Sequence, residues 1–94
     1  MTQSTQDAMN VIVRIMPRGD EVEVELSPYS TGKEIITAML DNNIAPKIDP
    51  EGNQYTYDLI HKRTQQKISD NRTLFDVGVK DGEVIYLAPI ITAG

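Results

Sequence analysis

The chain has 94 residues, which is enough for one domain, and a formal net charge of −5. This charge argues against nucleic acid or an anionic membrane as the main partner, because phosphate contacts need clustered Lys and Arg. The absence of cysteine excludes disulfides, thiolate catalysis and Cys-based metal sites. The first residues are polar, unlike a signal peptide, and no run approaches the roughly 18 apolar residues of a membrane span. We therefore expect a cytoplasmic protein.

The N-terminal half predicts a flexible leader followed by a β-hairpin. Residues 1–9 have no hydrophobic periodicity. Residues 10–16 are rich in β-branched side chains, which favours a strand. Residues 21–26 alternate Glu with Val or Leu, the pattern of a strand with one buried and one solvated face. The Pro-Arg-Gly-Asp sequence at 17–20 predicts the turn between these strands.

A helix is predicted after the hairpin. Thr31 and Glu34 match a capping box, in which each side chain accepts a hydrogen bond from the other residue's backbone N–H. An apolar stripe with helical spacing follows, made of Ile35, Ile36, Met39 and Leu40. Asn42 and Asn43 predict the end of the helix, because Asn tolerates the left-handed conformation.

The C-terminal half predicts short strands and turns. Residues 45–54 contain two prolines and a glycine and are expected to form a loop. Strands are expected at 55–61 and 67–68, followed by a helical turn in which Leu74, together with Phe75, is buried. Residues 83–88 are strongly apolar, as in a central strand, and Pro89 is expected to end the pairing of this strand.

The order hairpin, helix, strand, short strand, turn and strand predicts an α+β fold with one helix layer and one sheet layer. The last strand must pair beside the first to cover the helix. The predicted core consists of Val11, Val13, Val22, Val24, Leu26, Ile35 or Ile36, Met39, Leu40, Leu59, Leu74, Val84, and Tyr86 or Leu87.

This order, and the sequence DNRTLFDVGV at 70–79, resemble the ubiquitin family, where the corresponding sequence is DGRTLSDYNI. The spacing from this aspartate to the chain end equals that of ubiquitin. The resemblance covers residues 10–94 and implies a ubiquitin-like β-grasp: a mixed sheet of four to five strands packed on one helix. It divides the chain into a leader at 1–9, a domain at 10–89 and a tail at 90–94.

The tail carries the main functional prediction. The chain ends in Ala93-Gly94, and its last residues also resemble bacterial sulfur carriers for molybdopterin and thiamin, which end in two glycines. A terminal glycine has no Cβ, so its carboxylate can enter a narrow enzyme channel. The tail would give this carboxylate roughly 20 Å of reach when extended. The alternative is that small residues at a chain end are simply frayed.

A second predicted site lies on the sheet. By resemblance, Ile60 points outward at the centre of the ubiquitin binding surface, with Tyr86 and Ala88 on the neighbouring strand. Ile90 and Ile91 are expected to contribute to partner binding beside it. An exposed patch of this kind is a plausible docking surface. The alternative is that Lys62 and the leader partly cover Ile60.

Other polar residues have simpler interpretations. His61 is the only histidine, which leaves no His-based dyad or metal cluster, and we expect it to be solvated at a strand end. Asp70 is expected to cap its turn, and Asp76 the segment that follows it. The glutamates at 21, 23 and 25 form an acidic outer face that is expected to be solvated. We therefore predict no catalytic residues, no metal and no cofactor.

Three functional hypotheses follow. In the first, the chain is a bacterial ubiquitin-like modifier whose Gly94 carboxylate is activated and joined to target proteins by an isopeptide bond. Its partners would be activating-like and conjugating-like enzymes, target proteins and a deconjugating protease, and the free protein would be monomeric. In the second, it is a non-conjugated adaptor resembling the ubiquitin-like accessory proteins of type VII secretion. In the third, it is a sulfur carrier with Gly94 as a thiocarboxylate.

Overall fold

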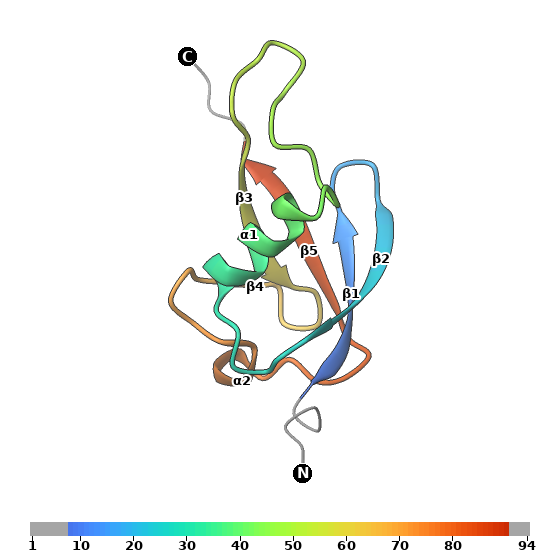
Figure 1. The fold of residues 1–94 in the computed structure, drawn as a ribbon. Helices are drawn as coiled ribbons and strands as arrows, with labels where there is room; N and C mark the ends of the chain where they lie inside the picture. Colours follow the sequence, from blue (N-terminus) through green and yellow to red (C-terminus); the bar gives the residue numbers. More distant parts are fainter. Residues whose placement is uncertain (1–7, 91–94) are drawn as a thin grey trace.

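The computed structural model describes residues 8–90, which form five strands and two helices (Figure 1). Strands β1 and β2 make the N-terminal hairpin, and the long helix α1 follows them. The bounds of the elements are β1 Met9–Ile15, β2 Asp20–Leu26, α1 Gly32–Asp41, β3 Thr56–His61, β4 Gln66–Ile68, α2 Leu74–Val77 and β5 Val84–Ile90. Strands β1 and β5 therefore each extend one residue beyond the boundaries expected for the domain.

The five strands form one mixed sheet in the order β2-β1-β5-β3-β4. β5 lies between β1, to which it is parallel, and β3, to which it is antiparallel. Figure 1 shows α1 lying across one face of this sheet, with β2 at one edge. The α+β β-grasp arrangement predicted from the order of elements is confirmed, including the pairing of the last strand beside the first.

The core lies between α1 and the sheet face that we call inner. Its fully buried side chains come from alternate residues of the strands, including Ile68 of β4, together with Ile35 of α1 and Leu74 of α2. Burying a side chain of this size stabilises the fold by about 1.5–3 kcal/mol. The buried apolar residues are Val11, Val13, Ile35, Met39, Ala45, Tyr57, Leu59, Ile68, Leu74, Val79, Ile85 and Leu87.

Some core predictions need correction. Of the pair Tyr86 and Leu87, Leu87 is buried and Tyr86 lies on the outer face. Val84 was also expected in the core, but it lies on the outer face because Ile85 is the residue that points inward. Leu40 is only partly buried, because the helix directs Ile35 and Met39 toward the sheet. Phe75 is 67% exposed, and its ring lies 5.9 Å from that of Tyr29, since α2 buries Leu74 instead.

The predicted capping box of α1 is present. Glu34 N–H donates to Thr31 Oγ1 at 3.2 Å, and Thr31 N–H donates to Glu34 Oε1 at 2.9 Å. The helix begins against the end of β4, and a Cβ on Gly32 would lie 2.5 Å from the carbonyl oxygen of Ser69. Only glycine allows this approach. At the other end, Asn43 adopts the left-handed conformation with φ 58°.

A second capping box begins α2. Asp76 N–H donates to Thr73 Oγ1 at 2.9 Å, and Thr73 N–H donates to Asp76 Oδ2 at 3.2 Å. Asp76 therefore caps the helix that contains it, and the expectation that it caps the following segment is wrong. Gly78, in the left-handed conformation with φ 80°, ends this helix.

The last strand continues through proline. Pro89 pairs with Tyr57 and Ile90 with Thr56, so the expectation that Pro89 ends regular pairing is wrong. The backbone groups of Leu87 face β1, because its carbonyl accepts from Met16 N–H at 2.9 Å. By alternation, Pro89 also faces that side, beyond the last β1–β5 pair at Ile15 and Leu87. Its missing N–H therefore costs no ladder bond.

Candidate functional site

The face of the sheet opposite α1 carries a continuous run of apolar side chains. Ile60 of β3 lies directly opposite Tyr86 of β5, and Ala88 and Ile90 follow at alternate positions along β5. On the other side of β5, Ile12 of β1 is paired with Val84. We call this surface the outer-face stripe: Ile12, Ile60, Val84, Tyr86, Ala88 and Ile90.

The stripe exists because β5 is the central strand. Its inner residues Ile85 and Leu87 are fully buried, while its outer residues are apolar as well. Among these, Ile90 is 42% exposed, and Tyr86 and Ala88 are half-buried by neighbouring strands. The structure thus places Ile60, Tyr86, Ala88 and Ile90 together on one accessible surface, although their binding role remains a prediction.

Charged side chains border the stripe on both sides. The guanidinium of Arg14 lies 5.4 Å from the centre of the Tyr86 ring, and its Nη2 is 2.6 Å from Glu21 Oε2. The hydrogen bond to Glu21 raises the pKa of Arg14, against a smaller effect of desolvation. On the other side, Lys67 Nζ is 3.1 Å from Asp58 Oδ1. An apolar centre with a charged rim is typical of docking surfaces.

These bordering residues were not identified from the sequence. The sequence predicted the strands that carry Arg14, Asp58 and Lys67. The sequence could not give the strand register, and it is the register that sets Arg14 beside Tyr86 and Lys67 beside Ile60. The immediate strand neighbours of Ile60 are Tyr86 and Lys67, whereas Lys62 follows β3 in the turn.

The remaining predicted site residues, Ile91, Ala93 and Gly94, lie outside the described residues. The structure therefore leaves the activation site at the chain end as a sequence-based prediction.

His61 is placed differently from the expectation. Its side chain is fully buried at the end of β3, and the expectation of a solvated histidine is wrong. Nε2 lies 2.8 Å from Glu83 Oε1, and Nδ1 has no hydrogen-bond partner among the residues that the structure describes. The alternation that points Tyr57 and Leu59 inward also points His61 inward.

Glu83 links His61 to the surface. Desolvation by burial acts to raise the pKa of Glu83, but it is outweighed by the backbone N–H of Lys80 and by the side chains of His61 and Arg63. Together these donors lower the pKa to about 2. Arg63 Nη2 also donates to the carbonyl of Gly78 at 3.1 Å, so the cluster ties the end of β3 to the segment before β5. We interpret this cluster as structural.

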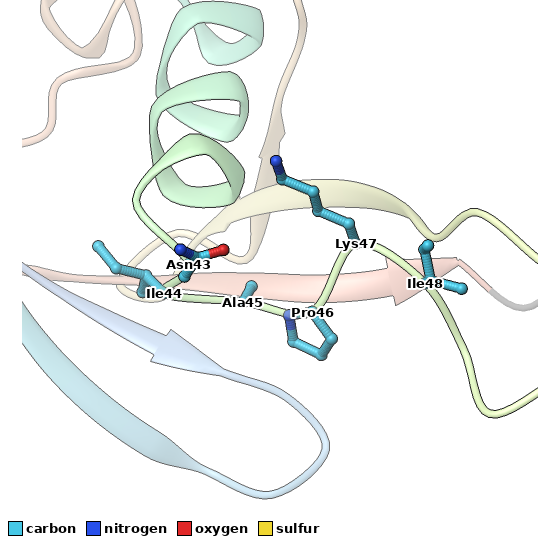
Figure 2. A pocket seen from close by; sticks show the side chains of 6 residues that line it. All are labelled: Asn43, Ile44, Ala45, Pro46, Lys47 and Ile48. Atoms are coloured by element: carbon cyan, nitrogen blue, oxygen red, sulfur yellow. The ribbon is translucent and has the colours of Figure 1, made fainter. Parts of the chain in front are cut away.

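A shallow depression lies in the segment that joins α1 to β3 (Figure 2). The hydroxyl of Tyr57 donates to the carbonyl of Pro46 at 2.7 Å and holds this segment in place. Lys47 is the one charged side chain in its lining, and none of the predicted site residues contributes to it. It is lined by Asn43, Ile44, Ala45, Pro46, Lys47 and Ile48.

Within residues 8–90 the side chains provide no group of three or more His, Asp or Glu residues that could hold a metal ion. None of the helices described there has the length and apolar character needed to cross a membrane.

Comparison with known proteins identifies the relatives of this chain. Residues 10–87 match the family model of YukD, described as a protein of the WXG100 protein secretion system. The chain belongs to the YukD family. The match begins within β1 and ends within β5, so it includes α1 and the strands between them.

Solved structures agree with the fold of this YukD-family protein. A ubiquitin from Caldiarchaeum subterraneum is similar with 24% identity and a TM-score of 0.67, covering 93% of this chain and 99% of that one. A de novo designed protein based on ubiquitin is similar with 16% identity and a TM-score of 0.69, covering 93% and 94%. These likenesses show the ubiquitin-like fold. No significant match was found among curated proteins.

Proposed function

We propose that this protein is a non-enzymatic adaptor of a WXG100 secretion system, which docks onto another protein of that system through the outer-face stripe. The observation that carries the proposal is the match to YukD over residues 10–87, a range that includes Ile60 and Tyr86. The match ends before the predicted activation site at Gly94. Membership of this family therefore supports a secretion role without itself supporting conjugation.

The outer-face stripe suits such docking. Ile60 and Tyr86 form its centre, where a partner would exclude water from both side chains. The charged pairs Arg14–Glu21 and Asp58–Lys67 lie at its rim. Such rim charges influence orientation and association rate more than affinity.

The test is complementation of a strain that lacks this protein, with secretion of WXG100 substrates as the measurement. Ile60→Lys places a charge at the centre of the stripe, so we expect secretion to fall to the level of the deletion strain. Ile48→Lys is the matched control, because Ile48 is an exposed isoleucine of the α1–β3 segment and is not part of the stripe. Equal secretion by the two variants, both folded by circular dichroism, would contradict the adaptor proposal.

A second candidate function is conjugation through Gly94, which is favoured by the ubiquitin-like spacing from the sequence at 70–79 to the chain end. Adenylation would release pyrophosphate from ATP, and a cysteine thiolate would then displace AMP to form a thioester. An amine of a target would displace the thiolate to give the isopeptide bond. A sulfur carrier would instead hold a thiocarboxylate at Gly94.

Deletion of Gly94 separates these candidates from the adaptor. As an adaptor, the deleted protein keeps normal secretion. As a modifier, it loses both a thiol-sensitive adduct, formed with ATP, magnesium and an activating enzyme, and a thiol-resistant target conjugate. As a sulfur carrier, it loses a mass increase of about 16 Da that marks replacement of the carboxylate oxygen by sulfur.

A further inference from the structure

The two edges of the sheet differ in how much strand they expose. The edge at β4 is three residues long, from Gln66 to Ile68. The edge at β2 is seven residues long, from Asp20 to Leu26, and Figure 1 shows it at the margin of the molecule. A long unpaired edge is a template on which another strand can pair.

The ladder determines which backbone groups face this edge. The N–H of Ile12 donates to the carbonyl of Glu83, just before β5, at 3.0 Å. The backbone groups of the neighbouring Val11 therefore face β2, where Val11 is paired with Val24. The backbone groups of Val24 are thus used by β1. Because these groups alternate in direction along a strand, the N–H and C=O groups of three intervening residues point to the open side. They belong to Glu21, Glu23 and Glu25, and we call them the β2 edge.

No backbone hydrogen bond from the part of the chain that the structure describes reaches the β2 edge beyond the β1–β2 ladder. The inner side chains beside it are also incompletely covered. Val22 and Val24 are half-buried, whereas Val11 and Val13 on the adjacent strand have 0% exposure. The reason is that α1 packs mainly over β3, on the other side of β1 and β5.

The outer side of β2 is acidic. Arg14 pairs with Glu21 at 2.6 Å, while Glu23 and Glu25 have no ion-pair partner among residues 8–90. Both of these glutamates are exposed. β2 therefore offers a strand partner an apolar row on one side and uncompensated negative charge on the other.

We propose that the β2 edge binds an extended segment of a partner protein, in which apolar residues alternate with Lys or Arg, and that this segment becomes a sixth strand of the sheet. The backbone groups of Glu21, Glu23 and Glu25 would supply the ladder bonds. The apolar side chains would extend the inner row, and the basic ones would lie beside Glu23 and Glu25. The β2 edge adjoins the outer-face stripe, because Glu23 lies opposite Ile12, but it contains no residue of the stripe. The proposal therefore stands independently of the adaptor function.

A second copy of the chain is a poorer occupant. Pairing two β2 strands would set the glutamate rows of both copies side by side on the outer face. Like charges opposite one another destabilise a strand pair. The chemistry of the edge therefore selects a basic segment over self-association.

The probe is the peptide acetyl-KVKIKVK-amide, titrated into the isotope-labelled full chain and followed by NMR. We expect saturable changes concentrated at residues 20–26, with slower hydrogen exchange of the Glu21, Glu23 and Glu25 amides. Two control peptides test the required chemistry: one with the same composition but broken alternation, and one with Glu in place of Lys. Binding of either control as strongly as the probe would overturn the proposal, as would changes centred on the outer-face stripe.

Variants at Glu23 test the geometry. Glu23→Pro removes an N–H that points to the open side and is not used by β1, a position where edge strands accept proline. Glu23→Gln is the matched control, because it also removes the charge but keeps the N–H. We expect the proline variant to bind the probe about tenfold more weakly than the glutamine variant. Equal affinities would overturn strand addition.

A charge reversal covers the case in which proline disturbs the fold. The double variant Glu23→Lys, Glu25→Lys should lose affinity for the lysine peptide and gain affinity for the glutamate peptide. An unchanged preference would overturn the proposed role of the acidic row.

Discussion

The inner and outer faces of the sheet are built from neighbouring residues of the same strands, yet they have different uses. On β3, Leu59 has 0% exposure beneath α1, while the next residue, Ile60, lies half-buried on the outer face. On β5, Leu87 and Tyr86 are divided in the same way. Similar apolar chemistry therefore stabilises the fold on one face and remains accessible to a partner on the other.

The difference shows why hydrophobicity alone does not identify the core. β5 is apolar on both faces because it is flanked by strands on both sides, and α1 covers only one face. The uncovered face keeps apolar surface in contact with water, which is unfavourable in the free protein. Binding of a partner would remove this surface from water and so would be favourable. Three measurements test how much different parts of the molecule contribute to stability.

The largest expected effect is on stability from the inner face. Leu59→Ala should lower the free energy of unfolding by about 2–5 kcal/mol, because it leaves a cavity in the core. Ile60→Ala, its neighbour on the outer face, should lower it by about 1 kcal/mol or less. Denaturant unfolding of the two variants measures the contrast. Equal losses would mean that the outer-face stripe is packed as firmly as the core.

A smaller effect concerns the cluster around His61. The pKa of Glu83 falls from 4.5 to about 2 on folding, so Glu83 stabilises the fold fully above pH 4.5. That stability is lost as pH falls through 2, and it amounts to at most ~3 kcal/mol at about 1.4 kcal/mol per pKa unit. Glu83→Gln should be less stable at pH 7 and should lose less stability between pH 5 and 2.

The control for this pH profile is Glu51→Gln, which removes an exposed carboxylate from the α1–β3 segment. It should keep the acid-dependent loss seen in the unchanged protein. A Glu83→Gln profile parallel to that of Glu51→Gln would show that the contacts of Glu83 with His61 and Arg63 contribute nothing to stability.

The smallest effect is expected on the outer face, from the ion pair between Asp58 and Lys67. Their side chains are 31% and 61% exposed, so water screens the attraction. A double-mutant cycle with Asp58→Asn and Lys67→Gln should give a coupling of about 1 kcal/mol or less, which decreases with added salt. A coupling well above this value would place the outer face among the main sources of stability.

Local patterns predicted much of the fold. The capping box at Thr31 and Glu34 is present, and the alternation of residues 21–26 corresponds to β2. These features depend on contacts within a few residues, which the sequence displays directly. The order of elements predicted the α+β class and the pairing of the last strand beside the first, and the resemblance to ubiquitin added the β-grasp.

Features that depend on non-local contacts were predicted less well. His61 was expected in water because it lies at a strand end, but Glu83, 22 residues away, supplies a partner that lets it be buried. Pro89 was expected to end the pairing of its strand, but the last pair between β1 and β5 is at Leu87, so no hydrogen bond to β1 is needed from Pro89. The exposure of Phe75 depends on how α2 docks, which a four-residue helix does not specify by itself.

By itself, the sequence determined the class of fold, the start and end of α1 and the alternation that separates the two faces of each strand. Only the tertiary structure decided the strand register, which sets Arg14 beside Tyr86 and Lys67 beside Ile60, and the position of α1, which leaves the outer face and the β2 edge uncovered. The physical reason is the separation along the chain of the residues that interact. Hydrogen-bonded caps and side-chain periodicity act within one element, whereas strand pairing and helix docking depend on residues far apart in the chain.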